Sequence, residues 1–230
     1  MDIVIESLLD GARRARGHVA IIDVFRAFTT AAVALAKGAS EVVMVGSADE
    51  ALALRAQGRV QLCMGEIGGR APPGFDFGNS PYEVSAADLA GCAIAQRTGA
   101  GTQGIVAAAQ ATRLYAASLV TASATARALV RGTPAAVTLV AMGNNAVVRT
   151  DEDEICALHL RNLIEGRPGH VEGARQMILA SREASYFGDP TRPHLPRADL
   201  DIALDIDRYD FAIRVELDDG YPVGRAERAQ

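Results

Sequence analysis

Short apolar runs rich in β-branched residues alternate along this chain with segments that favour helix. The run VAIIDVF, residues 19–25, precedes RAFTTAAVALAKGA, in which alanine and leucine favour a helix and Gly38 ends it. Similar runs recur at residues 41–46, 60–66, 92–98, 113–120 and 135–143. Continuous apolar strands are typical of a sheet that is covered on both faces. The alternation therefore predicts an α/β fold, a three-layer α/β/α sandwich around a mixed, largely parallel sheet.

A later stretch of the chain resembles the first strand–helix–strand segment. When the two are aligned, Thr29 falls on Thr102 and Val33 falls on Val106. We interpret this as a duplicated βαβ unit, with chance similarity of two alanine-rich stretches as the alternative. Loops that follow parallel strands meet at one edge of a sheet, where α/β proteins bind ligands. All 230 residues are interpreted as a single domain.

The C-terminal part of the chain carries weaker signals. The segment GDPTRPHLPRAD, residues 188–199, is predicted to be a proline-rich connection. The following residues indicate a short helix and a final edge strand that ends at residue 217. The tail from residue 218 onward is expected to be partly loose. Alanine-rich helices can pack inside the domain or across a homodimer interface, and both arrangements stay open.

Charge and apolar content narrow the kind of partner. The net charge of −5 does not favour nucleic acid or an anionic membrane, so an anionic ligand has to be met by local arginines. No apolar run reaches the ~18 residues of a membrane span. The first residues lack the apolar stretch of a signal peptide. The three cysteines are far apart and are predicted to be reduced thiols. We therefore expect a cytoplasmic protein.

The loop GEIGGRAPPGFDFGNSP, residues 65–81, is long and polar for a connection inside a compact domain. Its glycines allow the backbone to approach a ligand closely. Glu66 directly follows a buried strand, and Asp76 and Asn79 carry the hard oxygen ligands that Mg²⁺ accepts. The alternative is a surface loop in which Asp76 and Asn79 only make turns.

Other polar groups also follow predicted strands. In DVFRAFTT, Asp23 and Arg26 precede hydroxyls at a helix start, which suits an anion together with a cation. The alternative is a structural salt bridge between Asp23 and Arg26, with Thr30 as a helix cap. The turn RTGAGTQG has the glycines of a phosphate cradle but neither dinucleotide nor P-loop lettering. P-loop chemistry is therefore not expected.

The run TDEDE, residues 150–154, places acids in the first turn of a predicted helix. Such acids are usually solvated and stabilised by the helix dipole, and a metal-binding role is the alternative. The histidines are isolated and lack metal-ligand spacing, so each is expected to be a surface or packing residue; they are His18, His159, His170 and His194. Without a GxSxG motif, serine-hydrolase chemistry is unsupported.

The order of these motifs resembles a known family. DVFRAFTT, GEIGG with GFDFGNSP, RTGAGTQG and MG with EDEICA follow one another across residues 21–160. This arrangement is similar to the 2-phosphosulfolactate phosphatase family, also called ComB-like, and GFDFGNSP is its most specific part. The resemblance implies an α/β, Mg²⁺-dependent phosphatase that converts (2R)-O-phospho-3-sulfolactate to 3-sulfolactate and phosphate, a step that serves coenzyme M biosynthesis.

The resemblance also implies functional positions in several loops. In this chain they fall on Asp23, Arg26, Thr30, Glu66, Asp76, Asn79, Ser80, Glu152 and Asp153. The third motif reads RTGAGT where many family members read like TTNGT. Residues 188–199 also depart from the pattern that the family leads us to expect. Another phospho-hydroxyacid therefore stays open as the substrate.

Physical reasoning divides the candidate residues by role. The predicted metal ligands for Mg²⁺ are Asp23, Glu66, Asp76 and Asp153. The predicted catalytic residues are Asp23, Arg26, Glu66 and Asp76. The residues predicted to bind the small anionic substrate are Thr29, Thr30, Asn79, Ser80, Arg97, Thr98, Gly101 and Thr102.

Two mechanisms and a different class of protein remain as alternatives. A metal-activated water could attack phosphorus, or Asp23 could attack first and form an aspartyl-phosphate. Residue 25 is Phe, so Asp23 is not part of a D-x-D pair, and attack by water is favoured. A non-catalytic module that senses an anionic metabolite would use the same glycine turns and arginines.

Overall fold

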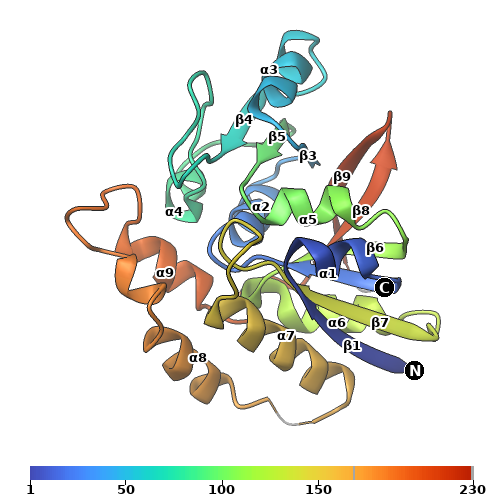
Figure 1. The fold of residues 1–230 in the computed structure, drawn as a ribbon. Coiled ribbons are helices and arrows are strands. Elements are labelled where there is room, and N and C mark those ends of the chain that lie inside the picture. Colours follow the sequence, from blue (N-terminus) through green and yellow to red (C-terminus); the bar gives the residue numbers. More distant parts are fainter. Residues whose placement is uncertain (168, 229–230) are drawn as a thin grey trace.

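The computed structural model describes residues 1–167 and 169–228 (Figure 1). Its strands are β1 (Asp2–Ser7), β2 (Gly17–Ile22), β3 (Glu41–Met44), β4 (Leu62–Gly65), β5 (Ala93–Arg97), β6 (Ala111–Ala117), β7 (Ala136–Ala141), β8 (Ala212–Asp218) and β9 (Tyr221–Glu227). Its α-helices are α1 (Leu8–Arg14), α2 (Ala27–Ala36), α3 (Ala48–Ala56), α4 (Pro81–Ser85), α5 (Gly101–Ala107), α6 (Ala122–Val130), α7 (Asp151–Ile164), α8 (Val171–Leu179) and α9 (Arg197–Ala203). Short 3₁₀ turns occur at Leu119–Thr121 and Ala184–Tyr186.

Two parallel half-sheets that run in opposite directions make up the sheet, and a hairpin joins them. The strand order across the described residues is β1–β7–β2–β6–β8–β9–β3–β5–β4. The first four strands are parallel to one another, as are the last three. The hairpin β8–β9 pairs antiparallel with β6 on one side and with β3 on the other. The predicted α/β class with a mixed, largely parallel sheet is confirmed.

Side chains along β2 show how the sheet is covered on both faces. Val19 and Ile21 pack into the apolar core beneath α1, α2 and α5. Ala20 and Ile22 point to the opposite face, into the core beneath α6 and α7. Because side chains alternate along a strand, one continuous apolar run supplies both cores. This alternation explains why the strand is apolar throughout rather than at every second residue.

The two segments aligned in the sequence are β2–α2–β3 and β5–α5–β6. Within neither segment do the two strands pair with each other; β2 pairs with β6, and β3 pairs with β5. Each segment therefore crosses from one half-sheet to the other, unlike a simple βαβ unit. Thr29 and Thr102 are both buried in the first turns of their helices, as the alignment requires.

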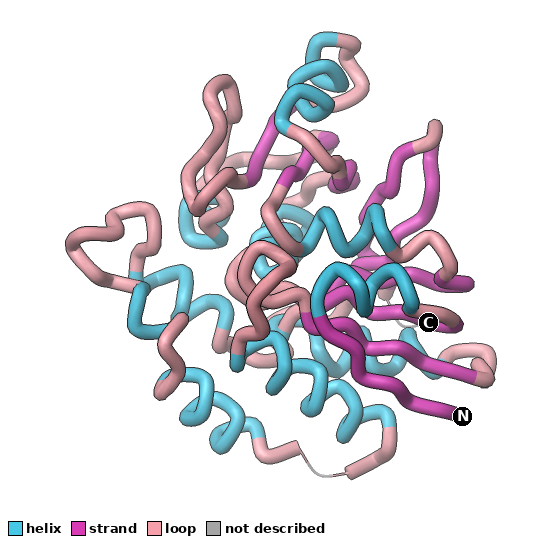
Figure 2. Tube along the Cα trace, in the orientation of Figure 1, coloured by secondary structure: helices cyan, strands magenta, loops and turns pink. Residues whose placement is uncertain are grey.

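Both half-sheets end on the same side of the molecule although their strands run in opposite directions. Sheet twist accumulates from strand to strand, and it turns the second half-sheet toward the first. The resulting closeness is direct, because the Gly101 N–H after β5 donates to Asp23 Oδ2 after β2 at 2.8 Å. Figure 2 shows the loops gathered between the two half-sheets on this side. One pocket therefore collects residues from both.

Several expectations about the chain ends are wrong. The tail forms β9 over Tyr221–Glu227, and β8 lies inside the sheet between β6 and β9 rather than at its edge. Residues 229 and 230 of the tail lie outside the described part. Hydrogen bonding to β3 and β6 holds this hairpin, a non-local effect that local composition does not reveal. Within the described residues, no helix combines the length and apolar character needed to cross a bilayer.

Candidate active site

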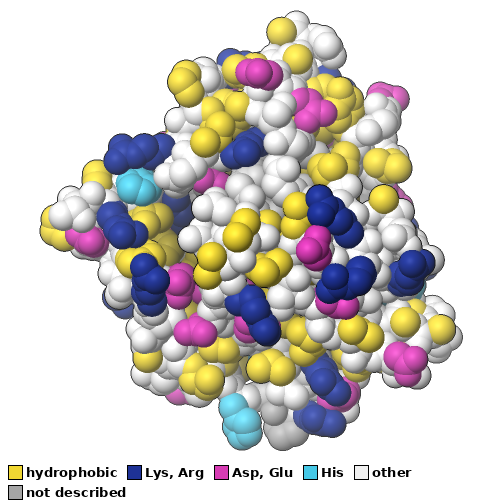
Figure 3. Space-filling view, in the orientation of Figure 1, with side chains coloured by type: hydrophobic (Ala, Val, Ile, Leu, Met, Phe, Trp, Pro, Cys, Tyr) yellow, Lys and Arg dark blue, Asp and Glu magenta, His cyan; other side chains and the backbone are white. Residues whose placement is uncertain are grey.

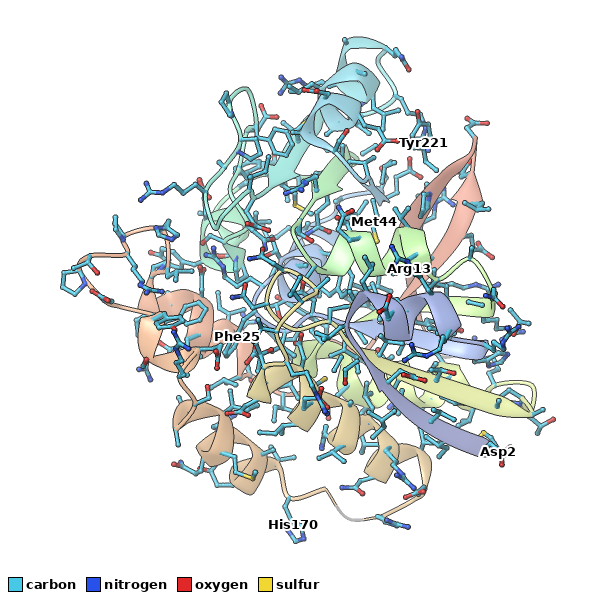
Figure 4. The ribbon with its side chains drawn as sticks, in the orientation of Figure 1. Asp2, Arg13, Phe25, Met44, His170 and Tyr221 are labelled. Carbon is cyan, nitrogen blue, oxygen red and sulfur yellow. The ribbon has the colours of Figure 1, made fainter. Side chains whose placement is uncertain are left out.

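A cavity of about 310 Å³ opens where the two half-sheets end. Figure 3 shows a hollow on the left of the molecule with basic side chains along its edge. The acidic residues that line the cavity are Asp23, Glu66, Glu152, Asp153 and Glu183. The basic and amide side chains that line it include Arg26, Arg192, His194, Asn79 and Asn145. Phe25, labelled in Figure 4, adds an apolar wall, and its ring packs edge-on against Phe187 at 5.0 Å.

Asp23 is held at the centre of the site by backbone N–H groups. Its Oδ1 accepts a hydrogen bond from Ala27 N at 3.0 Å, and its Oδ2 accepts one from Gly101 N at 2.8 Å. Burial raises the pKa of Asp23 to about 6, and the charge of Glu66 adds to the rise. The carboxylate is therefore fixed in place but lacks a cation that would offset its charge fully.

Asp153 lies on the same pocket from the first turn of α7. Its two oxygens accept hydrogen bonds from Val24 N and Gly143 N, both at 2.8 Å. These bonds tie the helix to the ends of β2 and β7. Burial raises the pKa of Asp153 well above its ordinary value, and the charges of Glu152 and Asp23 raise it further. The acids of this helical turn are thus not simply a solvated face.

The run of acids at the start of α7 divides into inward and outward groups. Glu152 and Asp153 are 4% and 2% exposed, whereas Asp151 is exposed and Glu154 pairs with Arg149. Glu152 Oε2 has no hydrogen-bond partner among the described residues. Burial raises the pKa of Glu152 to about 7, and the charges of Glu183 and Asp23 add to this. A buried carboxylate oxygen without a partner is a feature that calls for a ligand or a proton.

Glu66 enters the pocket from the loop after β4. Its Oε1 accepts from Gly99 N at 2.5 Å, and its Oε2 accepts from Gly69 N at 2.7 Å. Arg97 Nη1 donates to the Glu66 carbonyl at 2.8 Å. Arg97 therefore supports the loop that carries Glu66, and the structure does not bring its side chain to the cavity wall. The predicted role of Arg97 as a substrate ligand is not supported by this position.

Arg26 forms a buried ion pair with a residue that sequence reasoning missed. Its Nη1 donates to Asp199 Oδ2 at 2.5 Å and to the His194 carbonyl at 2.9 Å. Ser80 Oγ donates to the other oxygen of Asp199 at 2.7 Å. The alternative of a structural Asp23–Arg26 bridge is thus replaced by an Arg26–Asp199 pair. Asp199 is the last residue of the segment predicted to be a proline-rich connection, and no motif around it signals the contact.

The structure places Asp76 apart from the other predicted metal ligands. Its Oδ2 accepts hydrogen bonds from Arg55 Nη1 and from Cys63 N, both at 2.8 Å, and Arg55 lies on α3. Asp76 thus anchors its loop to the neighbouring strand and helix. This position fits the alternative in which the residue shapes a turn, and Asp76 is not among the described residues that line the cavity with Asp23 and Glu66.

Of the hydroxyl and amide groups predicted to bind substrate, some make hydrogen bonds within the loops and others line the cavity. Thr29 Oγ1 donates to Val24 O at 2.9 Å, and Thr30 Oγ1 donates to Asn79 O at 3.2 Å. Thr98 and Thr102 exchange hydrogen bonds around the turn after β5. These threonines hold the loops in place. Asn79 and Thr98 also line the cavity, and Asn79 Oδ1 has no partner in the described part of the chain.

The donor set fits a divalent cation in its chemistry. Across residues 1–167 and 169–228, no three Asp, Glu, His or Cys side chains are arranged ready to hold a metal ion. Five carboxylates nevertheless line one cavity, and burial and mutual repulsion raise the pKa of three of them, Asp23, Glu152 and Asp153. Hard oxygen ligands of this kind suit Mg²⁺, whose charge would offset their repulsion.

The α/β sheet has a cavity at its strand ends that is lined by acidic and basic side chains, an arrangement typical of enzymes that act on small charged molecules. The model of the 2-phosphosulpholactate phosphatase family matches residues 4–192. The chain belongs to this family, which identifies it as a phosphoric monoester hydrolase. The family resemblance drawn from the motifs is confirmed.

Individual relatives agree with the family match. A probable 2-phosphosulfolactate phosphatase of Deinococcus radiodurans is 34% identical over 171 residues, which cover 74% of this chain and 70% of the relative. A protein of the same description from Bacillus subtilis is 29% identical over 205 residues, with 88% of both chains covered. A third, from Thermoplasma volcanium, is 32% identical and covers 83% of this chain and 85% of its own.

Proposed function

We propose that this protein is a Mg²⁺-dependent phosphatase that hydrolyses (2R)-O-phospho-3-sulfolactate to 3-sulfolactate and phosphate. The observation that carries the proposal is the convergence of Asp23, Glu66, Glu152 and Asp153 with Arg26 on one cavity. The family and the printed descriptions of the relatives support the choice of substrate. We further propose that the protein acts in the cytoplasm and that its product serves coenzyme M biosynthesis.

The carboxylates of the cavity would hold the metal. Asp23, Glu66 and Asp153 keep unused lone pairs, because each oxygen accepts a single backbone hydrogen bond. Mg²⁺ held by these residues would supply positive charge beside the phosphoryl oxygens and so lower the barrier to attack on phosphorus. Backbone N–H groups donate hydrogen bonds to both carboxylate oxygens of Asp23 and limit its ability to attack phosphorus. This supports direct attack by water.

Other residues of the cavity bind and orient the reactants. Both hydrogen bonds of the Arg26 side chain to described residues use Nη1, so Nη2 and Nε can donate to phosphate oxygens. Glu152 Oε2 has no partner among the described residues and can accept a hydrogen bond from the attacking water. Phe25 and Phe187 exclude bulk water from this side and strengthen the electrostatic interactions within.

Phosphate release tests the proposal. We expect the purified protein to release phosphate from phosphosulfolactate. This release should stop after EDTA treatment and recover when Mg²⁺ is added. Glu152→Gln should lower kcat by about 100-fold or more, as expected when a positioned acid–base group is removed. The matched control is Asp151→Asn, which changes the adjacent exposed acid and should leave kcat unchanged.

A panel of phosphomonoesters separates the remaining alternatives. Faster turnover of another phospho-hydroxyacid would keep the phosphatase and replace its substrate. Tight binding of the substrate without any phosphate release, unaffected by EDTA, would instead support a non-catalytic anion-binding protein. Light scattering of the purified protein would decide between a monomer and the homodimer that the sequence left open.

A further inference from the structure

A compact turn places two basic residues on the rim of the cavity. Arg192 and His194 line the cavity from residues 188–195, the segment between the second 3₁₀ turn and α9. Gly188 N donates to Leu195 O at 2.8 Å and closes the turn. Inside it, Arg192 N donates to Asp189 O at 2.8 Å. Sequence reasoning interpreted this segment only as a proline-rich connection, yet its backbone is hydrogen-bonded into a defined shape.

The Arg192 side chain stacks on an aromatic ring and makes one long ion pair. Its guanidinium carbon lies 3.8 Å from the centroid of the Tyr186 ring, which also lines the cavity. Its closest carboxylate oxygen among the described residues is Asp189 Oδ2, 3.9 Å from Nε. Stacking of this kind holds a guanidinium plane in place and leaves its N–H groups free to donate. Arg192 therefore offers a stacked cation whose ion pair with Asp189 is long and leaves N–H groups for a ligand.

Arg192 and His194 lie at the rim, above carboxylates that are buried at the floor of the cavity. The His194 carbonyl accepts from Arg26, so the turn is also anchored to the buried ion pair. Burial lowers the pKa of His194, and the charges of Arg70, Arg26 and Arg192 lower it further. The carboxylates Asp23 and Asp153 lie on the cavity floor and are almost fully buried. With a cation held by these carboxylates, a ligand that carries an anionic group at each end would match the arrangement.

We propose that Arg192, held against Tyr186, binds the sulfonate of the substrate and so determines its specificity. The inference rests on the proposed function, because it assigns the transferred phosphoryl group to the carboxylate floor. The sulfonate is attached one carbon further from the phosphate-bearing carbon than the carboxylate is, so it is the anionic group that extends toward the rim. A weakly hydrated guanidinium also suits a weakly hydrated, three-oxygen anion.

Three substrates test the assignment. Phosphosulfolactate carries both a carboxylate and a sulfonate, phospholactate lacks the sulfonate, and the phosphate ester of isethionate lacks the carboxylate. For Arg192→Ala we expect kcat/KM to fall about 10- to 100-fold on the two sulfonates, mainly through KM, as for loss of a charged hydrogen bond. Turnover of phospholactate should stay within about twofold of the wild-type value. Equal losses on all three substrates, loss on phospholactate alone, or no loss would each overturn the proposal.

Matched variants separate substrate binding from general surface charge. Arg182 lies 5.8 Å from the same Tyr186 ring but does not line the cavity, so Arg182→Ala should leave all three substrates unaffected. Tyr186→Phe keeps an aromatic face and should retain selectivity, whereas Tyr186→Leu removes it and should raise KM for the sulfonates. An effect of Arg182→Ala as large as that of Arg192→Ala would contradict a specific role for Arg192.

Failure of the inference can be told apart from failure of the proposed function. If the wild-type protein releases phosphate from none of the substrates, the proposed function fails, and binding of 3-sulfolactate and of lactate is measured by calorimetry instead. We then expect binding of 3-sulfolactate that weakens at least about 10-fold in Arg192→Ala, with lactate much weaker. Equal binding by wild-type and Arg192→Ala protein would overturn the role of Arg192 independently of catalysis.

Discussion

The Gly101 N–H donates a 2.8 Å hydrogen bond to Asp23 Oδ2, and this bond joins the ends of two half-sheets that run in opposite directions. A Cβ atom on Gly101 would lie 2.8 Å from Ala27 Cβ and 2.9 Å from Asp23 Oδ2. Real Cβ atoms do not approach other heavy atoms so closely. Glycine at this position is therefore required by the neighbouring strand end rather than by its own helix.

Gly101→Ala should disturb the site by pushing α5 away from Asp23. We expect a loss of about 1–3 kcal/mol in the free energy of unfolding, as for overpacking of a core, together with a large fall in kcat. The matched control is Gly173→Ala in α8, where the added Cβ comes no closer than 3.7 Å to His170. That change should stabilise the protein by about 0.5–1 kcal/mol, as measured by urea denaturation. Normal activity in Gly101→Ala would contradict the tight packing.

The buried Arg26–Asp199 pair should be costly to break. Asp199→Asn leaves a buried guanidinium without its charge partner, and we expect a loss of about 3–5 kcal/mol in the free energy of unfolding. Activity should fall as well, because Arg26 lines the cavity. Arg127→Gln, which breaks an exposed ion pair with Asp210, is the control and should cost less than about 1 kcal/mol. Similar losses in both variants would show that burial of the Arg26 pair is not decisive.

The stability of the metal-free protein should fall as pH rises from about 4 to about 7. The folded-state pKa values of Asp23 and Glu152 are raised to about 6 and about 7, above their ordinary values. Below the ordinary pKa values, both the folded and the unfolded protein carry these protons, and the contribution of the two groups to stability is complete. As pH rises through the folded-state values the folded protein has to accept repelling charges, and this contribution is lost.

Urea denaturation across this pH range, with and without Mg²⁺, measures the effect. Saturating Mg²⁺ should remove most of the decline, because a bound cation offsets the carboxylate charges. Glu152→Gln removes one of the titrating groups and should flatten the metal-free profile relative to wild type. A profile that neither Mg²⁺ nor Glu152→Gln alters would count against a cation at these carboxylates, whatever the enzyme turns over.

Asp76→Asn tests the placement of a residue that the sequence assigned to the metal. The structure engages Asp76 with Arg55 and the Cys63 backbone, so we expect Asp76→Asn to cost about 1–2 kcal/mol of stability and to keep kcat within a few-fold of wild type. Asp23→Asn, the same change inside the cavity, should abolish activity. Loss of Mg²⁺-dependent activity in Asp76→Asn equal to that in Asp23→Asn would return Asp76 to the site.

Local patterns were sufficient for the α/β class, for most strands and helices, and for the residues that directly follow strands. Asp23 and Glu66 could be identified because each comes immediately after an apolar run, and such positions lie at the carboxyl edge of a sheet. Whether a short segment forms a buried strand depends largely on its own residues and on their neighbours along the chain. The sequence alone therefore predicts where such strands end. The family membership followed from the same motifs.

Contacts between distant parts of the chain were decided only by the tertiary structure. The C-terminal hairpin lies in the middle of the sheet because β8 pairs with β6 and β9 pairs with β3. Nothing in the composition of the hairpin itself requires this position. Arg192 lines the cavity and Asp199 pairs with Arg26, although both come from a proline-rich region without a motif. Asp76 pairs with Arg55 instead. Hydrogen bonds to residues that are distant in the sequence fix where a polar side chain points. A local sequence pattern does not show which distant residues those partners are.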